Sequence, residues 1–63
     1  MATVGEQIKI ARKQANLTQI ELANSAGISR SYLAGAEQGK YNPSFKVLKK
    51  IAAACSVDLN FFQ

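Results

Sequence analysis

The sequence of 63 residues predicts an all-α fold in a single domain, residues 1–63. Apolar residues recur at intervals of three and four along most of the chain, as they do on the buried face of an α-helix. Ser, Thr or Asp precedes several of these stretches and glycine follows two of them, which are common signals for the start and end of a helix. No segment alternates apolar and polar residues as a half-buried strand does. These observations predict five short helices around one core.

The first helix is predicted over residues 4–15. The spacing of one apolar helical face is shared by Val4, Ile8, Ala11 and Ala15. Arg12 falls on the same face, four residues after Ile8. A charge on a buried face must find a partner or extend its head group to water, so Arg12 is expected to do one of these.

Thr18 begins the second predicted helix. Its hydroxyl and the carboxylate of Glu21, three residues later, have the spacing of a capping box, which satisfies two free backbone N–H groups. The predicted buried stripe consists of Leu22, Ala23 and Ala26. Gly27 comes next and suits the left-handed conformation that ends many helices.

A third helix is predicted from its N-cap Ser29 to about Gln38, with Gly39 after its end. Two short helices joined by a short turn that contains glycine form a helix-turn-helix, here over residues 18–38. The inward face of the third helix carries Leu33, Ala36 and Glu37. Ala34 and Gly35 fall on the outward face, so the middle of that face is expected to be bare.

The segment Lys40-Tyr41-Asn42-Pro43 predicts a loop, because the residue before a proline avoids helical geometry. Ser44 caps a fourth helix over residues 45–55. Its core face is expected to hold Val47, Leu48, Ile51, Ala52 and Cys55. Asp58 then caps a last helical turn, which returns Leu59 and one or both of Phe61 and Phe62 to the core.

The composition argues for some classes of function and against others. Eight Lys and Arg against four Asp and Glu give a formal net charge of +4, which favours nucleic acid or a membrane surface as partner, although solubility alone is a simpler explanation. There is no histidine, no zinc-ligand spacing, no paired carboxylate and no phosphate-binding loop, so we expect no enzyme, catalytic residue, metal, cofactor or small-molecule ligand. No apolar run approaches the roughly 18 residues of a membrane span, so no membrane partner is expected. The lone Cys55 fits a core position and a reducing cytoplasm.

The stretch from Leu17 to Val57 resembles the helix-turn-helix domain of the Cro and phage-repressor family, also called the XRE family. The matching residues, in one order and spacing, are Leu17-Thr18-Gln19, Glu21-Leu22-Ala23, Ala26-Gly27-Ile28-Ser29, Leu33, Glu37, Gly39-Lys40, Pro43 and Leu48. The resemblance extends over roughly residues 4–62 and implies a compact lambda-repressor-like bundle of five helices. It also implies a cytoplasmic transcription factor that binds double-stranded operator DNA, usually as a homodimer on an inverted repeat.

The resemblance implies roles for individual residues. Gln19 would brace the third helix and touch phosphate, and Thr18 would contact the phosphate beside it. The bases would be read by Ser29, Arg30, Ser31 and Tyr32. Phosphates on the opposite side would be held by Lys40, Asn42 and Ser44, where the N-terminus of the fourth helix adds free N–H groups.

Two further pairings follow from the same resemblance. Arg12 and Glu37 match positions that form an ion pair in some phage repressors, and the helical periodicity places both on inward faces. The dimer contact would involve Leu59, Phe61 and Phe62. One phenylalanine ring should fill the core while the other is free for a partner, unless both rings pack within one chain.

Several alternatives stay open at this stage. Arg30 suits guanine, to which a guanidinium donates two hydrogen bonds, but a phosphate contact is nearly as good an explanation. Tyr32 either contacts a phosphate or a thymine methyl, or lies flat as part of the core. Gly35 either permits close approach to DNA or marks a short reading surface. The bare outward face also suits a protein-interaction module, or an antitoxin-type autoregulator, that uses the same fold.

Overall fold

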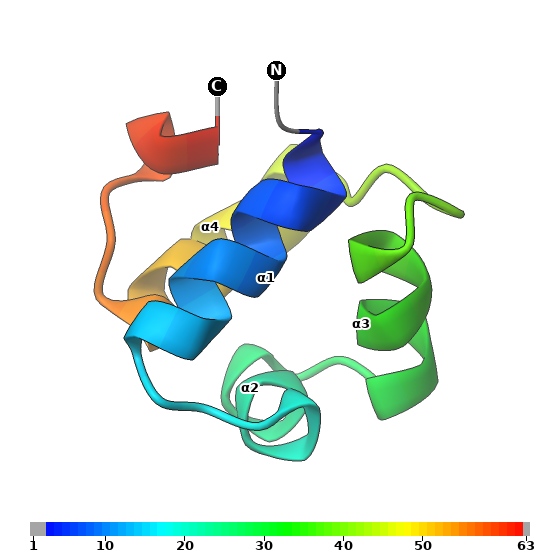
Figure 1. The fold of residues 1–63 in the computed structure, drawn as a ribbon, viewed down its shortest axis with the longest axis horizontal. Helices are drawn as coiled ribbons and strands as arrows, with labels where there is room; N and C mark the ends of the chain where they lie inside the picture. Colours follow the sequence, from blue (N-terminus) through cyan, green and yellow to red (C-terminus); the bar gives the residue numbers. More distant parts are fainter. Residues whose placement is uncertain (1–2, 63) are drawn as a thin grey trace.

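The computed structural model describes residues 3–62, which form four α-helices and a terminal 3-10 helix (Figure 1). The elements are α1 (Val4–Gln14), α2 (Gln19–Ala26), α3 (Arg30–Glu37), α4 (Phe45–Cys55) and η1 (Leu59–Phe62). No strand occurs within residues 3–62. The all-α prediction is therefore confirmed. The count of five helices is not, because the last predicted helix forms only as the four-residue 3-10 segment η1.

The first two helices begin with capping boxes. Glu21 N donates to Thr18 Oγ1 at 3.1 Å, and Thr18 N donates to Glu21 Oε1 at 2.9 Å, which confirms the predicted box at α2. Thr3 and Glu6 form a second box at the start of α1, which the sequence analysis did not predict. Serine caps begin α3 and α4, as predicted. Local hydrogen bonds thus explain where each α-helix starts.

The core receives one fully buried large side chain from each α-helix. These side chains, all 0% exposed, are Ile8, Leu22, Leu33 and Ile51. Phe62 of η1 joins them at 7% exposed, so this ring fills the core as one of the two phenylalanines was expected to do. Burial of each such side chain stabilises the fold by about 1.5–3 kcal/mol, which makes the meeting point of the four α-helices the main source of stability.

The helices are arranged so that α2 and α3 lie on one side of the α1–α4 pair. In Figure 1, α4 passes behind α1, α2 lies below them, and α3 stands at the right. η1 packs against α1 and α4 on the opposite side from α2. Together α2 and α3 form the predicted helix-turn-helix, and this arrangement leaves one side of the pair uncovered by other helices. No helix within residues 3–62 has the length and apolar character that crossing a membrane requires.

Gly5 allows α1 and α3 to touch backbone to backbone. It is buried, and a Cβ added at this position would collide with the carbonyl oxygen of Ala36 and lie 2.8 Å from that of Glu37. Both obstacles are main-chain atoms, which cannot move aside without shifting the end of α3. No sequence pattern pointed to a role for Gly5, yet this contact sets how closely α3 approaches the core.

Candidate nucleic-acid interface

A three-residue turn joins α2 to α3. Gly27 ends α2 in the left-handed conformation with φ 69°, as predicted, and the Ile28 N–H donates to the carbonyl oxygen of Ala23 at 3.0 Å. Ser29 Oγ then accepts from the Tyr32 N–H at 3.0 Å and caps α3. This turn is the reason that the first turn of α3 projects beyond the core. The hydroxyl of Ser29 is already used as an acceptor, whichever other role the residue has.

The first turn of α3 presents its polar side chains to solvent. Arg30 and Ser31 are exposed, while Leu33, Ala36 and Glu37 are buried on the opposite side, as the periodicity predicted. The guanidinium of Arg30 makes no hydrogen bond or ion pair with residues 3–62. An unpaired guanidinium has five N–H donors available for an external acceptor.

A side-chain network ties α3 to α1 and α2. Arg12 Nε donates to Glu37 Oε2 at 2.8 Å and Arg12 Nη2 donates to Glu37 Oε1 at 3.2 Å, so the structure brings these two predicted partners together in a bidentate ion pair. Gln19 Nε2 also donates to Glu37 Oε1 at 3.2 Å. Arg12 Nη1 donates to the Leu17 carbonyl at 3.0 Å. Because the side chains of Arg12 and Glu37 are only 12% and 3% exposed, the bonds are shielded from water and hold α3 in place.

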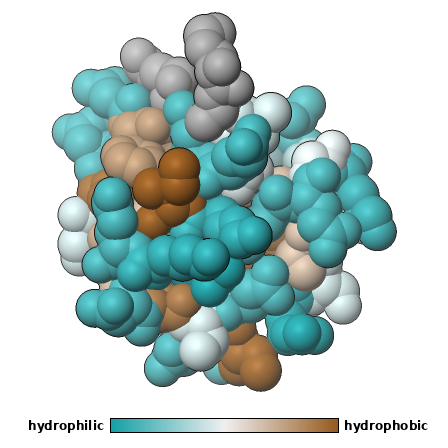
Figure 2. Space-filling model, viewed as in Figure 1, coloured by the Kyte–Doolittle hydropathy of each residue, from teal (hydrophilic) through white to brown (hydrophobic). Residues whose placement is uncertain are grey.

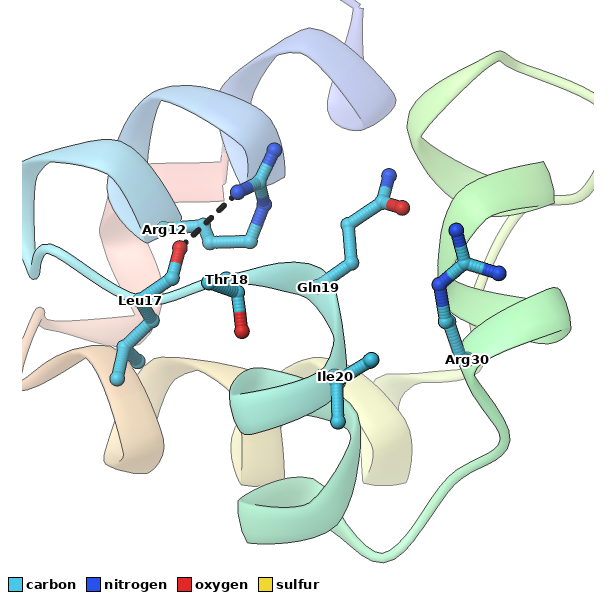
Figure 3. A pocket seen from close by; sticks show the side chains of 6 residues that line it. All are labelled: Arg12, Leu17, Thr18, Gln19, Ile20 and Arg30. Carbon is cyan, nitrogen blue, oxygen red and sulfur yellow. Dashed lines mark hydrogen bonds between the residues drawn. The ribbon is translucent and has the colours of Figure 1, made fainter.

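An open hollow of about 420 Å³ lies beside this network (Figure 3). It is lined by Arg12, Leu17, Thr18, Gln19, Ile20 and Arg30. In Figure 3 the side chain of Gln19 lies between Arg12 and Arg30. Glu37 neutralises Arg12, so Arg30 is the cation of the hollow that has no carboxylate partner within the described chain. A guanidinium, a hydroxyl and the start of α2 together suit an anionic oxygen.

Ile20 is a member of this surface that the sequence analysis missed. Its side chain is 56% exposed, although isoleucine is usually buried. Figure 2 shows a mostly hydrophilic face with a larger hydrophobic area left of the centre and a smaller, separate one at the bottom, where α2 lies. The sequence carried no clear signal for this exposure, because Ile20 lies three residues before Ala23 and interval spacing alone does not separate it from the buried stripe Leu22, Ala23 and Ala26.

The middle of α3 is not bare, and the prediction of an open surface at Gly35 is wrong. Gly35 is buried beneath the ring of Tyr41, which comes from the loop after α3. A Cβ at position 35 would lie 2.9 Å from Tyr41 Cδ2 and would collide with Cε2. The ring of Tyr32 also packs against that of Tyr41, with centroids 5.5 Å apart and an interplanar angle of 46°. The glycine therefore accommodates a side chain of the same chain.

The loop after α3 carries the residues predicted to hold phosphates. Lys40, Asn42 and Ser44 are all exposed. Ser44 Oγ accepts from the Val47 N–H at 3.3 Å and caps α4, so its hydroxyl proton remains available as a donor. The structure thus places these three residues in one continuous segment between α3 and the first turn of α4.

The residues predicted to form a dimer contact lie far from α3 in the fold. Leu59 and Phe62 line an apolar groove of about 440 Å³ together with Phe45, Leu48 and Asn60. Phe61 is partly buried and meets Phe62 edge to face, with ring centroids 5.5 Å apart. Phe62 belongs to the core of its own chain, and Phe45 is 65% exposed at the rim of the groove.

The acidic residues are engaged in bonds within the fold. Backbone and side-chain hydrogen bonds from Thr3 lower the pKa of the Glu6 carboxyl, and Glu21 caps α2. Glu37 pairs with Arg12, and Asp58 Oδ1 accepts from the Asn60 N–H at 2.8 Å. Burial raises the pKa of the Cys55 thiol, opposed by the nearby Arg12 charge, so this cysteine stays protonated in the core. Within residues 3–62 no group of three His, Cys, Asp or Glu side chains is placed to bind a metal ion.

Comparison with known proteins supports the family resemblance noted from the sequence. The helix-turn-helix family matches residues 8–62 of the chain. The immunity repressor protein of Bacillus phage phi105 is 47% identical over 58 residues, which cover 92% of this chain and 40% of the repressor. The chain thus spans less than half the length of that relative.

Solved structures share the fold over nearly its whole length. The restriction-modification controller protein C.AhdI from Aeromonas hydrophila has a TM-score of 0.90 and 30% identity, covering 95% of this chain and 91% of that one. The N-terminal DNA binding domain of SinR from Bacillus subtilis has a TM-score of 0.86 and 35% identity, covering 94% and 87% respectively. With the family match over most of its residues, this chain belongs to the helix-turn-helix family of Cro and phage repressors, the XRE family.

Proposed function

We propose that this chain is a sequence-specific DNA-binding domain that represses transcription by occupying a promoter. The observation that carries the proposal is the exposed first turn of α3, where an unpaired Arg30 projects from a helix that is braced from behind by Gln19, Glu37 and Arg12. A rigid helix with polar groups near its N-terminus is what a helix-turn-helix inserts into the major groove. The roles of an immunity repressor and a DNA binding domain in its relatives support the same function.

The contacts divide between bases and phosphates. Arg30 and Ser31 would read base edges, with Arg30 donating two hydrogen bonds to guanine O6 and N7. Thr18 and the start of α2 would hold a phosphate on one side of the groove. Lys40, Asn42 and Ser44 would hold phosphates on the other side. Gln19 is committed to Glu37 through one N–H, so its carbonyl oxygen and second N–H are left for DNA or water.

We propose further that the chain acts as a homodimer in the cytoplasm on an inverted repeat. The apolar groove beside η1, with Leu59 on its wall and Phe61 next to it, is the surface that we assign to the partner. Two copies related by a twofold axis would place their α3 helices in successive major grooves, roughly 34 Å apart. Phe62 would contribute indirectly, because it holds η1 on the core.

The alternative of a protein-interaction module loses the observation that favoured it. That hypothesis drew some weight from the bare stretch Ala34-Gly35-Ala36, whose outward residues were expected to be Ala34 and Gly35. Ala36 is buried in the core and Gly35 lies under Tyr41, so the smooth face does not exist.

Selection of bound sequences from random duplex DNA tests the proposed function. The expected result is a motif with twofold symmetry and half-sites spaced by about one helical turn. A motif without symmetry would contradict the homodimer only. Recovery of no preferred sequence at low salt, with the protein folded, would contradict DNA reading itself.

A further inference from the structure

Tyr41 occupies the outward surface of α3 one turn after Ser31. Residues four apart on a helix lie on the same face, so Gly35 follows Ser31 along the outward side. Because Gly35 has no side chain, the space that a Cβ would fill is taken by the Tyr41 ring. Tyr41 is nevertheless 51% exposed. The surface of α3 therefore continues past Ser31 as an aromatic ring that comes from another segment.

The backbone fixes this ring in place. Gly39 adopts a φ of +85° and turns the chain back toward α3, and the Lys40 N–H donates to the Gly35 carbonyl at 2.9 Å. These features match the Schellman motif, a common way to end a helix. Tyr32 supports the ring from the side at 5.5 Å between centroids, and Pro43 is buried where the loop reaches α4. The Tyr41 ring is thus held by packing on Gly35, by the neighbouring ring of Tyr32 and by the turn at Gly39.

We propose that Tyr41 is a specificity-determining residue that contacts a base, most simply the 5-methyl group of a thymine, in the major groove. The inference rests on the proposed function, because it requires α3 to enter the groove. Direct reading uses hydrogen bonds and apolar contacts to base edges, and an aromatic ring suits the thymine methyl. The ring lies over the second turn of α3, in line with Ser31. Lys40 and Asn42, on either side of Tyr41 in the chain, remain available for phosphates.

The proposal explains the glycine inside α3. Glycine costs about 1 kcal/mol relative to alanine in a helix interior, so its presence needs a compensating benefit. The benefit is that Tyr41 can approach the helix axis closely enough to remain within the surface that faces DNA. Any larger residue at position 35 would push the ring outward.

Sequence selection with the wild type, Tyr41→Ala and Tyr41→Phe tests this role. The wild type should prefer thymine at one base pair per half-site, Tyr41→Ala should lose that preference and no other, and Tyr41→Phe should keep it. Replacing that thymine by deoxyuridine removes the methyl group and should weaken wild-type binding roughly fourfold per half-site, as expected for one buried methyl group. The same replacement should not change binding by Tyr41→Ala.

Other outcomes separate this inference from the proposed function. An unchanged motif for Tyr41→Ala, or an equal loss of affinity on all sequences, would overturn the base contact while leaving DNA binding intact. A wild type that selects no motif would refute the proposed function instead. Gly35→Ala provides a second variant that keeps the tyrosine but displaces its ring, and it should lose the same base preference. Retention of the full motif by folded Gly35→Ala would also count against the proposal.

Discussion

Glu37 is the most shielded charge within the described residues, and its carboxylate is stabilised by two side-chain donors from other helices. Arg12 supplies two hydrogen bonds and Gln19 a third, around a side chain that is 3% exposed. Removal of one member of a buried ion pair leaves the other charge without compensation in a poor solvent. Substitution of one member of the pair is therefore expected to lower the free energy of unfolding more than substitution of both members.

We predict that Arg12→Met lowers the free energy of unfolding by about 3–5 kcal/mol, because Glu37 is left buried and charged. The double variant Arg12→Met, Glu37→Met removes both charges and should recover most of the loss. Urea unfolding followed by circular dichroism measures both variants. An equal loss in the single and double variants would show that packing of the arginine stem, and not the stranded charge, accounts for the effect.

Arg30 differs from Arg12 because it is exposed and has no partner within residues 3–62. Arg30→Ala should leave the free energy of unfolding nearly unchanged. It should weaken binding to the selected sequence by about 1–3 kcal/mol and relax the preference at one base pair. Fluorescence anisotropy with matched and mismatched duplexes measures this difference.

Arg30→Lys is the matched control, because lysine keeps the charge but lacks the planar fork for bidentate bonding. It should recover affinity for all sequences without restoring the base preference. If Arg30→Ala weakens binding equally on every duplex, Arg30 contacts phosphate and the base-reading role is wrong.

The helices show which parts of the structure are encoded locally. The cap of α2, the left-handed Gly27, the serine cap of α3 and the bounds of α4 at residues 45–55 were all predicted. Each depends on hydrogen bonds between residues at most five apart, and a window of sequence contains all of the groups involved. Helix ends can therefore be predicted from the sequence where the hydrogen-bond partners that form them are neighbours in the chain.

One local feature, the capping box of Thr3 and Glu6, was not predicted. The other features that were not predicted depend on contacts between segments. Helical periodicity shows which face of α3 Gly35 occupies, but it does not show that Tyr41 folds back to cover that face. Likewise, no pattern within α1 shows that Gly5 meets the end of α3. The Arg12 and Glu37 pair lies between these cases. Periodicity placed both residues inward, and the family resemblance supplied the pairing that the structure shows.

Thr18 combines a local structural role with a proposed phosphate contact, and the second capping box allows the two to be separated. Thr18→Ala should cost about 1 kcal/mol of stability through loss of the cap at α2. It should also weaken binding to all duplexes, because its hydroxyl no longer reaches phosphate. Thermal unfolding and anisotropy measure the two effects.

Thr3→Ala is the control, since Thr3 caps α1 through the same hydrogen bonds but is not among the residues proposed to touch DNA. It should lose a similar amount of stability and keep wild-type affinity at a temperature where both variants are folded. Equal loss of affinity in the two variants would show that weakened stability alone reduces binding.

At the scale of the whole molecule, the charge distribution favours a polyanion. The four carboxylates are engaged in helix caps, a turn and one ion pair, whereas seven of the eight Lys and Arg residues have no ion-pair partner among the described residues. The positive field should raise the rate and strength of encounter with any duplex, and salt should screen it. Charge alone therefore predicts binding without sequence preference, to which the α3 surface adds selectivity.

The dependence of DNA affinity on salt tests which lysines make direct contacts. Each contact between a lysine and a phosphate releases counterions and steepens the fall of log K with log salt concentration by roughly 0.9. Lys40→Ala should reduce this slope by about 1 per subunit and weaken binding to all duplexes equally. Lys13→Ala, an exposed position on α1 outside the proposed interface, should lower affinity slightly at low salt and leave the slope unchanged.

Titrations of one duplex at several salt concentrations compare the two variants. Equal slopes for Lys40→Ala and the wild type would remove Lys40 from the phosphate contacts, and a reduced slope for Lys13→Ala would extend the interface to α1.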